Sequence, residues 1–237
     1  MMSLLVLEGV SKCYRRGSRE QVALVDVSLN IDAGEMLVVY GRRQSGRSTL
    51  LRVAAAIERP DSGVVRLEGR DLAERSSVPL AGNIGFCQRT LGSPDAETVL
   101  EQIALALLVR GVSPSAARSR ARAILDRVDC AGLINAQPAE LGTTDRVRVS
   151  IARALAGAPR LLVADEPTLG VDLLDRDAIL QLLRSLADEG IAILTSAGDS
   201  TAFLGADRVL QISDGRLRGA QQPEVAQVFP LRRSQSR

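Results

Sequence analysis

Short apolar runs separated by turn residues occupy the first and last thirds of the chain. They predict strands at residues 4–10, 22–31, 36–40 and 64–67, and again at 161–164, 191–195 and 209–212. A helical pattern begins near Ser48, and residues 178–187 form an amphipathic helix closed by Gly190. Strands that alternate with helices in this way are typical of an α/β core built on a parallel sheet.

The middle of the chain is mostly helical. Residues 98–109 have helical spacing, and Ser113-Pro114 has the form of an N-cap followed by proline at the first helical position. The next helix has an apolar face formed by Ala117, Ala121, Ile124, Leu125 and Val128. We therefore predict a single domain, with its core at residues 1–88 and 141–217, a helical subdomain at 89–140 and a tail at 218–237.

Composition argues against several classes of protein. The 30 basic and 28 acidic residues give a net charge of +2, so no surface for nucleic acid is indicated. No apolar run approaches the ~20 residues of a membrane span, and no cationic region precedes the apolar start as in a signal peptide. The basic end, with Arg232, Arg233 and Arg237, is more typical of a solvated terminus than of lipid contact.

Cysteine, histidine and lysine are scarce. Cys13, Cys87 and Cys130 are widely spaced and form no metal or redox motif, as expected for reduced thiols in the cytosol. The chain has no histidine, and Lys12 is its only lysine. Chemistry that needs either side chain elsewhere must therefore use a substitute.

A glycine-bearing loop follows the strand at residues 36–40. Residues 41–49, Gly-Arg-Arg-Gln-Ser-Gly-Arg-Ser-Thr, fit the phosphate-loop pattern G-x-x-x-x-G-K-[ST] everywhere except at the lysine, which is Arg47. The glycines let backbone N–H groups turn toward phosphate oxygens, and the following helix adds its positive end. The Ser48 hydroxyl is suited to Mg²⁺. Arg47 keeps the positive charge, but its planar fork is bulkier than an ammonium.

A pair of acids ends the strand at residues 161–164. In a phosphate-loop protein the first acid, here Asp165, helps to hold Mg²⁺, and the second, Glu166, can activate the attacking water. Residues 150–155, Pro159 and residues 165–168 resemble the most recognisable block of the ABC ATPases, and the resemblance extends over residues 4–217. The chain is most similar to the compact importer type and the lipoprotein- or macrolide-export type.

This resemblance implies a fold and a set of ligands. The fold is the α/β P-loop NTPase fold, with a parallel-sheet core, an N-terminal antiparallel β subdomain and an α-helical subdomain. ATP and Mg²⁺ are the implied ligands. Tyr14 matches the aromatic residue that stacks on adenine, with a half-buried strand tyrosine as the alternative. Gln88 matches the glutamine that senses Mg²⁺ and faces the membrane partner, and Asp172 ends the loop that crosses the cassette dimer.

Other family motifs are altered. The signature Leu-Ser-Gly-Gly-Gln is Leu-Gly-Thr-Thr-Asp at residues 141–145, where β-branched threonines crowd the approach to a phosphate and Asp145 adds negative charge. Ser196 stands at the switch-histidine position, and losing one transition-state partner costs about 10²–10³ in rate. Gln44 replaces a loop glycine, which puts a tight turn at risk.

The predicted site has three groups of residues. The catalytic residues are Glu166, Ser196 and Gln88, and the metal-binding residues are Ser48, Gln88 and Asp165. The nucleotide-binding residues are Tyr14, Gly41, Gln44, Ser45, Gly46, Arg47, Ser48, Thr49, Gly142, Thr143 and Thr144.

Two functions follow from these motifs. The favoured one is an ATP-binding subunit of an ABC transporter that hydrolyses ATP slowly or not at all, and the alternative is an active ATPase motor. Soluble ABC proteins of DNA repair or translation are disfavoured, because the chain has neither two cassettes nor a long coiled-coil insert. Either function implies a separate transmembrane permease and a second cassette, supplied by this chain or by an intact paralogue. Either also implies a peripheral place on the cytoplasmic face of the membrane, without nucleic acid.

Overall fold

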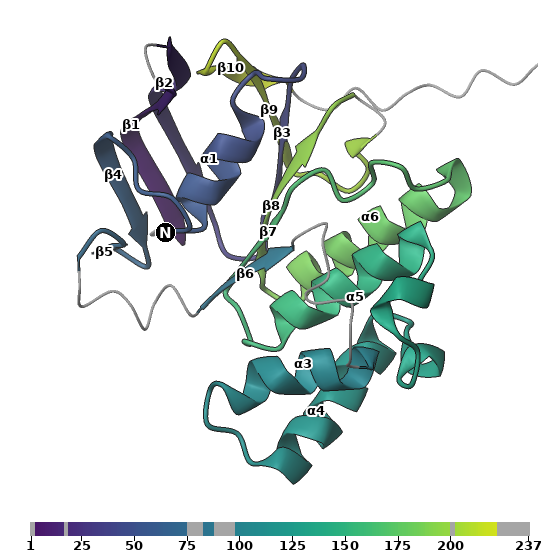
Figure 1. Cartoon of the computed structure of the whole chain (residues 1–237). Helices are drawn as coiled ribbons and strands as arrows, with labels where there is room; N and C mark the ends of the chain where they lie inside the picture. The colour runs from purple at the N-terminus through teal and green to yellow at the C-terminus, as the bar shows by residue number, and fades with distance from the viewer. Residues whose placement is uncertain (1–2, 17–18, 75–82, 88–97, 200–201, 222–237) are drawn as a thin grey trace, which may run out of the picture.

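Two sheets and a group of helices make up the described part of the chain (Figure 1). The computed structural model describes residues 3–16, 19–74, 83–87, 98–199 and 202–221. The first sheet is antiparallel and has the order β2-β1-β4-β5. Its strands are β1 (Leu5–Arg16), β2 (Arg19–Ile31), β4 (Ser62–Leu67) and β5 (Arg70–Asp71).

The second sheet has six strands in the order β10-β9-β3-β8-β7-β6. They are β3 (Met36–Tyr40), β6 (Ile84–Cys87), β7 (Leu161–Ala164), β8 (Ala192–Ala197), β9 (Arg208–Ser213) and β10 (Arg216–Gln221). All neighbours pair in parallel except β9 and β10. The predicted fold, a parallel-sheet core with an antiparallel β subdomain and a helical subdomain, is confirmed.

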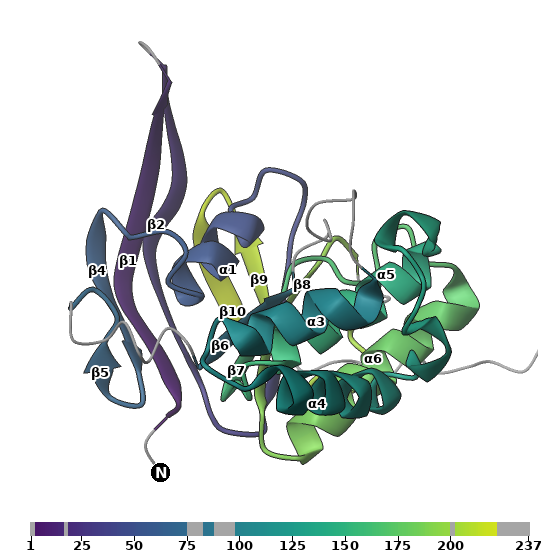
Figure 2. The same ribbon diagram turned by 60° about the horizontal axis from the view of Figure 1, so that its bottom comes forward.

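Helices cover both faces of the six-stranded sheet. Helix α1 (Arg47–Ala54) packs between the two sheets (Figure 1). Four helices gather on the opposite face, seen together in Figure 2: α3 (Val99–Leu108), α4 (Pro114–Arg127), α5 (Thr143–Leu155) and α6 (Leu173–Asp188). Two short 3₁₀ turns, η2 (Ala131–Leu133) and η3 (Pro138–Glu140), connect α4 to α5. Among the described residues, none of these helices combines the length and apolar character that a membrane crossing requires.

Strand alternation divides the interior into two cores. In β3, Leu37 and Val39 face α1 and the antiparallel sheet, whereas Met36 and Val38 face the helical layer. All four side chains are fully buried, because a parallel strand in the middle of a sheet is covered on both faces. This burial explains why β3 and β7 have continuous apolar sequences rather than alternating ones.

Several predicted elements are confirmed at their predicted bounds, and others differ. The strands at 36–40 and 161–164 match β3 and β7, and Ser113 is the N-cap residue of α4 with Pro114 at its first position. Thr98 caps α3 through a capping box with Glu101. Helix α6 starts five residues earlier than predicted, at Leu173, and β10 extends the sheet beyond the predicted core boundary at residue 217.

Candidate functional site

Three parallel strands bring the predicted site residues to one edge of the six-stranded sheet. The phosphate loop leaves β3 at Gly41, the acids Asp165 and Glu166 follow β7, and Ser196 lies near the end of β8. Ligands of open α/β sheets bind at this carboxyl edge. The loop, the acid pair and Ser196 therefore lie at the same edge of the sheet.

Two glycines of the loop have no room for a side chain. A Cβ at Gly41 would lie 2.3 Å from the backbone oxygen of Ile212. A Cβ at Gly46 would lie 2.3 Å from the backbone oxygen of Ala23, and Gly46 has φ of +107° at the N-cap of α1. These positions therefore require glycine, and they fix the close approach of the loop to β2 and β9.

The tight backbone turn at position 44 forms even though this residue is glutamine rather than glycine. Its φ is +65°, in the left-handed region, so the backbone turns there without a glycine. A residue with a Cβ pays roughly 1–2 kcal/mol for this conformation. Gln44 is exposed and lines the cavity beside the loop together with Ser45 and Gly46.

Arg47 contacts the predicted catalytic acid. Its Nη2 lies 2.6 Å from Oε1 of Glu166, and the Arg47 side chain is only 7% exposed. Oε1 of Glu166 and Nη1 of Arg47 both lie beside Gly198, the residue that follows β8. The cation that replaces the phosphate-loop lysine is thus held by the acid that would activate water.

Ser196 is hydrogen-bonded to both acids, through the Asp165 side chain and the Glu166 backbone. Its hydroxyl donates to Oδ1 of Asp165 at 2.6 Å and accepts the backbone N–H of Glu166 at 2.9 Å. The side chain is 1% exposed. In this arrangement Ser196 fixes the turn after β7 and keeps the Asp165 carboxylate in place.

A cavity of about 440 Å³ lies beside the loop. Its lining includes Tyr14 and the loop residues Gln44, Ser45, Gly46, Arg47, Ser48 and Thr49. Within the described residues, Ser45 Oγ and Arg47 Nη1 are buried polar atoms that have no hydrogen-bond partner. Since buried polar groups are nearly always paired, and Arg47 is a cation, the cavity suits an anionic phosphate group.

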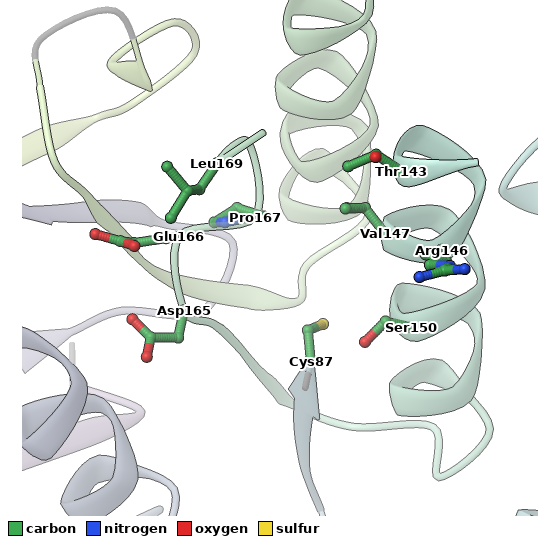
Figure 3. A pocket seen from close by; sticks show the side chains of 9 residues that line it. All are labelled: Cys87, Thr143, Arg146, Val147, Ser150, Asp165, Glu166, Pro167 and Leu169. Atoms are coloured by element: carbon green, nitrogen blue, oxygen red, sulfur yellow. The ribbon is translucent and has the colours of Figure 1, made fainter. Parts of the chain in front are cut away.

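The predicted metal ligands line different cavities. Ser48 lines the loop cavity, whereas Asp165 and Glu166 line a smaller cavity of about 180 Å³ with Cys87 and residues of α5. Figure 3 shows both carboxylates pointing away from α5. Hydroxyl and carboxylate oxygens are suitable Mg²⁺ ligands. The residue types therefore fit the metal, and the Arg47–Glu166 pair connects the two cavities.

The Cys87 thiol at the end of β6 lines the smaller cavity but carries no chemistry there. Burial raises its pKa to about 12, so it stays protonated at neutral pH. Burial likewise raises the pKa of Cys130 to about 11. Both thiols are free of disulfide bonds.

The signature region forms a third cavity. Gly142 is the N-cap of α5, and Thr143 and Thr144 form its first turn. The Thr144 hydroxyl donates to Oδ2 of Asp175 at 2.8 Å, which ties α5 to α6. Thr143 is exposed on this surface, whereas Thr144 is half-buried, and both line the cavity.

Gln88 lies outside the described residues. Its predicted roles, as a catalytic and metal-sensing residue and as a marker of the permease contact, stay predictions.

Comparisons with known proteins agree with this geometry. Residues 24–169 match the family model described as ABC transporter. The chain belongs to this family. It is 35% identical over 219 residues to the lipoprotein-releasing system ATP-binding protein LolD 2 of Caulobacter vibrioides, covering 90% of this chain and 96% of that protein. It is 34% identical to the macrolide export ATP-binding/permease protein MacB 1/2 of Paracoccus denitrificans, covering 90% of this chain but 33% of that longer protein.

Solved cassettes share the whole architecture of this ABC chain. A dimeric ATP-binding cassette in a post-hydrolysis state, bound to ADP and Pi, superimposes with a TM-score of 0.84 at 28% identity. The match covers 93% of this chain and 99% of the solved one. The match therefore extends over nearly the whole of that solved cassette.

The sequence did not indicate four residues that line the loop cavity, Gln21, Ala23, Arg52 and Glu58. Arg52 and Glu58 lie beside Tyr14 and form an ion pair, with Arg52 Nε 2.6 Å from Glu58 Oε1. Arg52 is in the last turn of α1, where a basic residue is favourable for the helix dipole, so nothing in the pattern singled it out.

Proposed function

We propose that this cassette is the ATP-binding subunit of a membrane transporter, and that it hydrolyses ATP slowly or not at all by itself. The observation that carries the proposal is the ion pair between Arg47 and Glu166, at 2.6 Å. A general base must be within reach of the proton that it takes and must have the right protonation state. A carboxylate that already neutralises a buried guanidinium is poorly placed for that role.

The same pair argues for weak binding of ATP. The phosphates compete with Glu166 for Arg47, and they bring further negative charge close to two carboxylates. Mg²⁺, when bound by Ser48 and Asp165, would offset part of the phosphate charge. Two exposed arginines of the loop, Arg42 and Arg43, add positive charge to the loop itself. We therefore propose that ATP binds, but less tightly than in a cassette whose loop has a lysine.

A working motor remains the second candidate. It is favoured by Asp165 and Glu166 after β7, by Ser48 in the loop and by a match that covers nearly the whole length of LolD 2. In that function ATP itself would have to draw Arg47 away from Glu166 and free the carboxylate.

The partners follow from the family. LolD is described as part of a lipoprotein-releasing system, and the MacB protein combines ATP-binding and permease in one longer chain. We propose that this chain docks on a separate membrane permease at the cytoplasmic face, and that two cassettes pair there. A homodimer would place Arg47 and Ser196 in both sites, whereas an intact paralogue would supply one site with its own lysine and histidine.

The test is steady-state release of phosphate by the purified chain with Mg²⁺, beside its Glu166→Gln variant. We expect negligible turnover in both proteins. A rate of about one per second that is abolished by Glu166→Gln would establish the working motor.

A further inference from the structure

The part of the loop cavity lined by Tyr14, Arg52 and Glu58 contains a cluster of polar groups around one hydroxyl. The Tyr14 hydroxyl donates to Oε2 of Glu58, and Nη2 of Arg52 donates to the Tyr14 oxygen at 3.3 Å. The hydroxyl oxygens of Tyr14 and Thr49 lie 3.4 Å apart. Three groups therefore meet at the tip of one tyrosine.

The ion pair beneath this hydroxyl is partly buried and locally fixed. Arg52 Nε lies 2.6 Å from Oε1 of Glu58, and the two side chains are 35% and 26% exposed. The backbone N–H of Glu58 also donates to the carbonyl of Arg52 at 3.2 Å. Glu58 can thus accept the Tyr14 hydroxyl with Oε2 while its Oε1 binds Arg52. These contacts connect α1, which contains Arg52, to β1, which contains Tyr14.

A second cation covers one face of the Tyr14 ring. Lys12 Nζ lies 5.9 Å from the ring centroid and 2.9 Å from Oδ1 of Asp61. Lys12 and Tyr14 are two residues apart on β1, so their side chains project from the same face of the strand. One ring face has a cation–π contact, and a planar ligand can stack only on the other.

We propose that Arg52 and Glu58 are positioning residues for the nucleobase of the ligand. They fix the Tyr14 ring at the cavity wall, so that its open face is set for stacking before the ligand arrives. An aromatic side chain that is already held in one rotamer loses less entropy on binding. This inference rests on the proposed binding of ATP, and it adds the residues that select for a base rather than for phosphate.

The experiment compares ATP with tripolyphosphate, which has the phosphates but no base. Dissociation constants are measured by calorimetry for the wild-type chain, Glu58→Gln and Tyr14→Phe. We expect each variant to bind ATP about tenfold more weakly, a loss that corresponds to part of the free energy of one aromatic–base stack. The affinity of each variant for tripolyphosphate should be unchanged. In the double variant the two losses should not add, because both break the same contact.

A matched control is Glu189→Gln, which removes one partner of the exposed Arg127–Glu189 pair, remote from the cavity. It should leave both ligands unaffected. Equal weakening of ATP and tripolyphosphate by Glu58→Gln would mean a merely structural role and would overturn the inference while ATP binding stands. Unchanged ATP affinity in both variants would overturn it too. Failure of the wild-type chain to bind ATP would overturn the proposed function together with this inference.

Discussion

In the loop cavity the acid Glu58 holds the aromatic ring of Tyr14, whereas the acid Glu166, in the neighbouring cavity, holds the cation of the phosphate loop. Both acids are partly buried and both contact an arginine of α1, Arg52 and Arg47. At the base end the ion pair stabilises a side chain that would contact the ligand. At the phosphate end the ion pair occupies the side chain that the ligand needs. We propose that the same kind of contact supports binding in one place and opposes it in the other.

The largest effect is expected from a substitution that disturbs the phosphate-binding and base-binding parts of the site together. Gly46→Ala puts a Cβ against the carbonyl of Ala23 at a φ of +107°, so the start of α1 must shift. We expect the free energy of unfolding in urea to fall by about 2–4 kcal/mol, with loss of binding for ATP and for tripolyphosphate. Gly132→Ala, whose Cβ would meet no atom within 4 Å, is the control. A stable Gly46→Ala variant with normal binding would show that α1 does not connect the two ends.

An intermediate effect is expected when only the phosphate end is changed. Arg47→Lys replaces the planar fork with an ammonium that fits the loop. Calorimetry should show ATP affinity that is unchanged or up to about tenfold tighter, with the contacts of Tyr14 unaffected. A clear loss of affinity would mean that Arg47 is a dedicated phosphate ligand, and the contrast between the two ends would disappear.

The smallest effect concerns the strain in the loop. Gln44→Gly relieves the left-handed conformation, and Ala158→Gly does the same at φ of +48°, remote from the cavity. In thermal unfolding, both substitutions should raise the free energy of unfolding by up to about 1 kcal/mol. The relief of backbone strain is partly offset because glycine loses more conformational entropy on folding. ATP affinity should change by less than about twofold in either variant, since the turn is already formed. A large gain in affinity for Gln44→Gly alone would mean that Gln44 distorts the loop.

The fold could be predicted where burial controls the sequence. The continuous apolar runs of β3 and β7 and the Ser113-Pro114 start of α4 were sufficient, because strands buried on both faces and proline at a helix start leave direct marks. The outer half of β1, after residue 10, and the first three residues of β2 were missed. Residues such as Lys12 are held there by backbone pairing, to Leu24 in this case, rather than by apolar contacts.

The candidate site could be predicted in its residues but not in its contacts. The motifs located Arg47, Glu166 and Ser196, yet nothing local indicates that Arg47 reaches across the sheet edge to Glu166. That contact depends on the order of β3, β8 and β7 in the sheet. The start of α6 was also missed, because the exposed Leu173 and Leu174 obscure the amphipathic pattern.

One measurement tests the contrast most directly: the dissociation constant for ATP of the wild-type chain, Glu166→Gln and Glu58→Gln, under identical conditions. Each variant replaces an acid by its amide, Glu58 in the loop cavity and Glu166 in the cavity beside it. Glu166→Gln should tighten ATP binding by about tenfold, because Arg47 is released and a carboxylate near the phosphates is removed. Glu58→Gln should weaken it by about tenfold, because the Tyr14 ring is no longer fixed. Opposite signs are the predicted result, and a weakening in both variants, or no change with Glu166→Gln, would contradict the account.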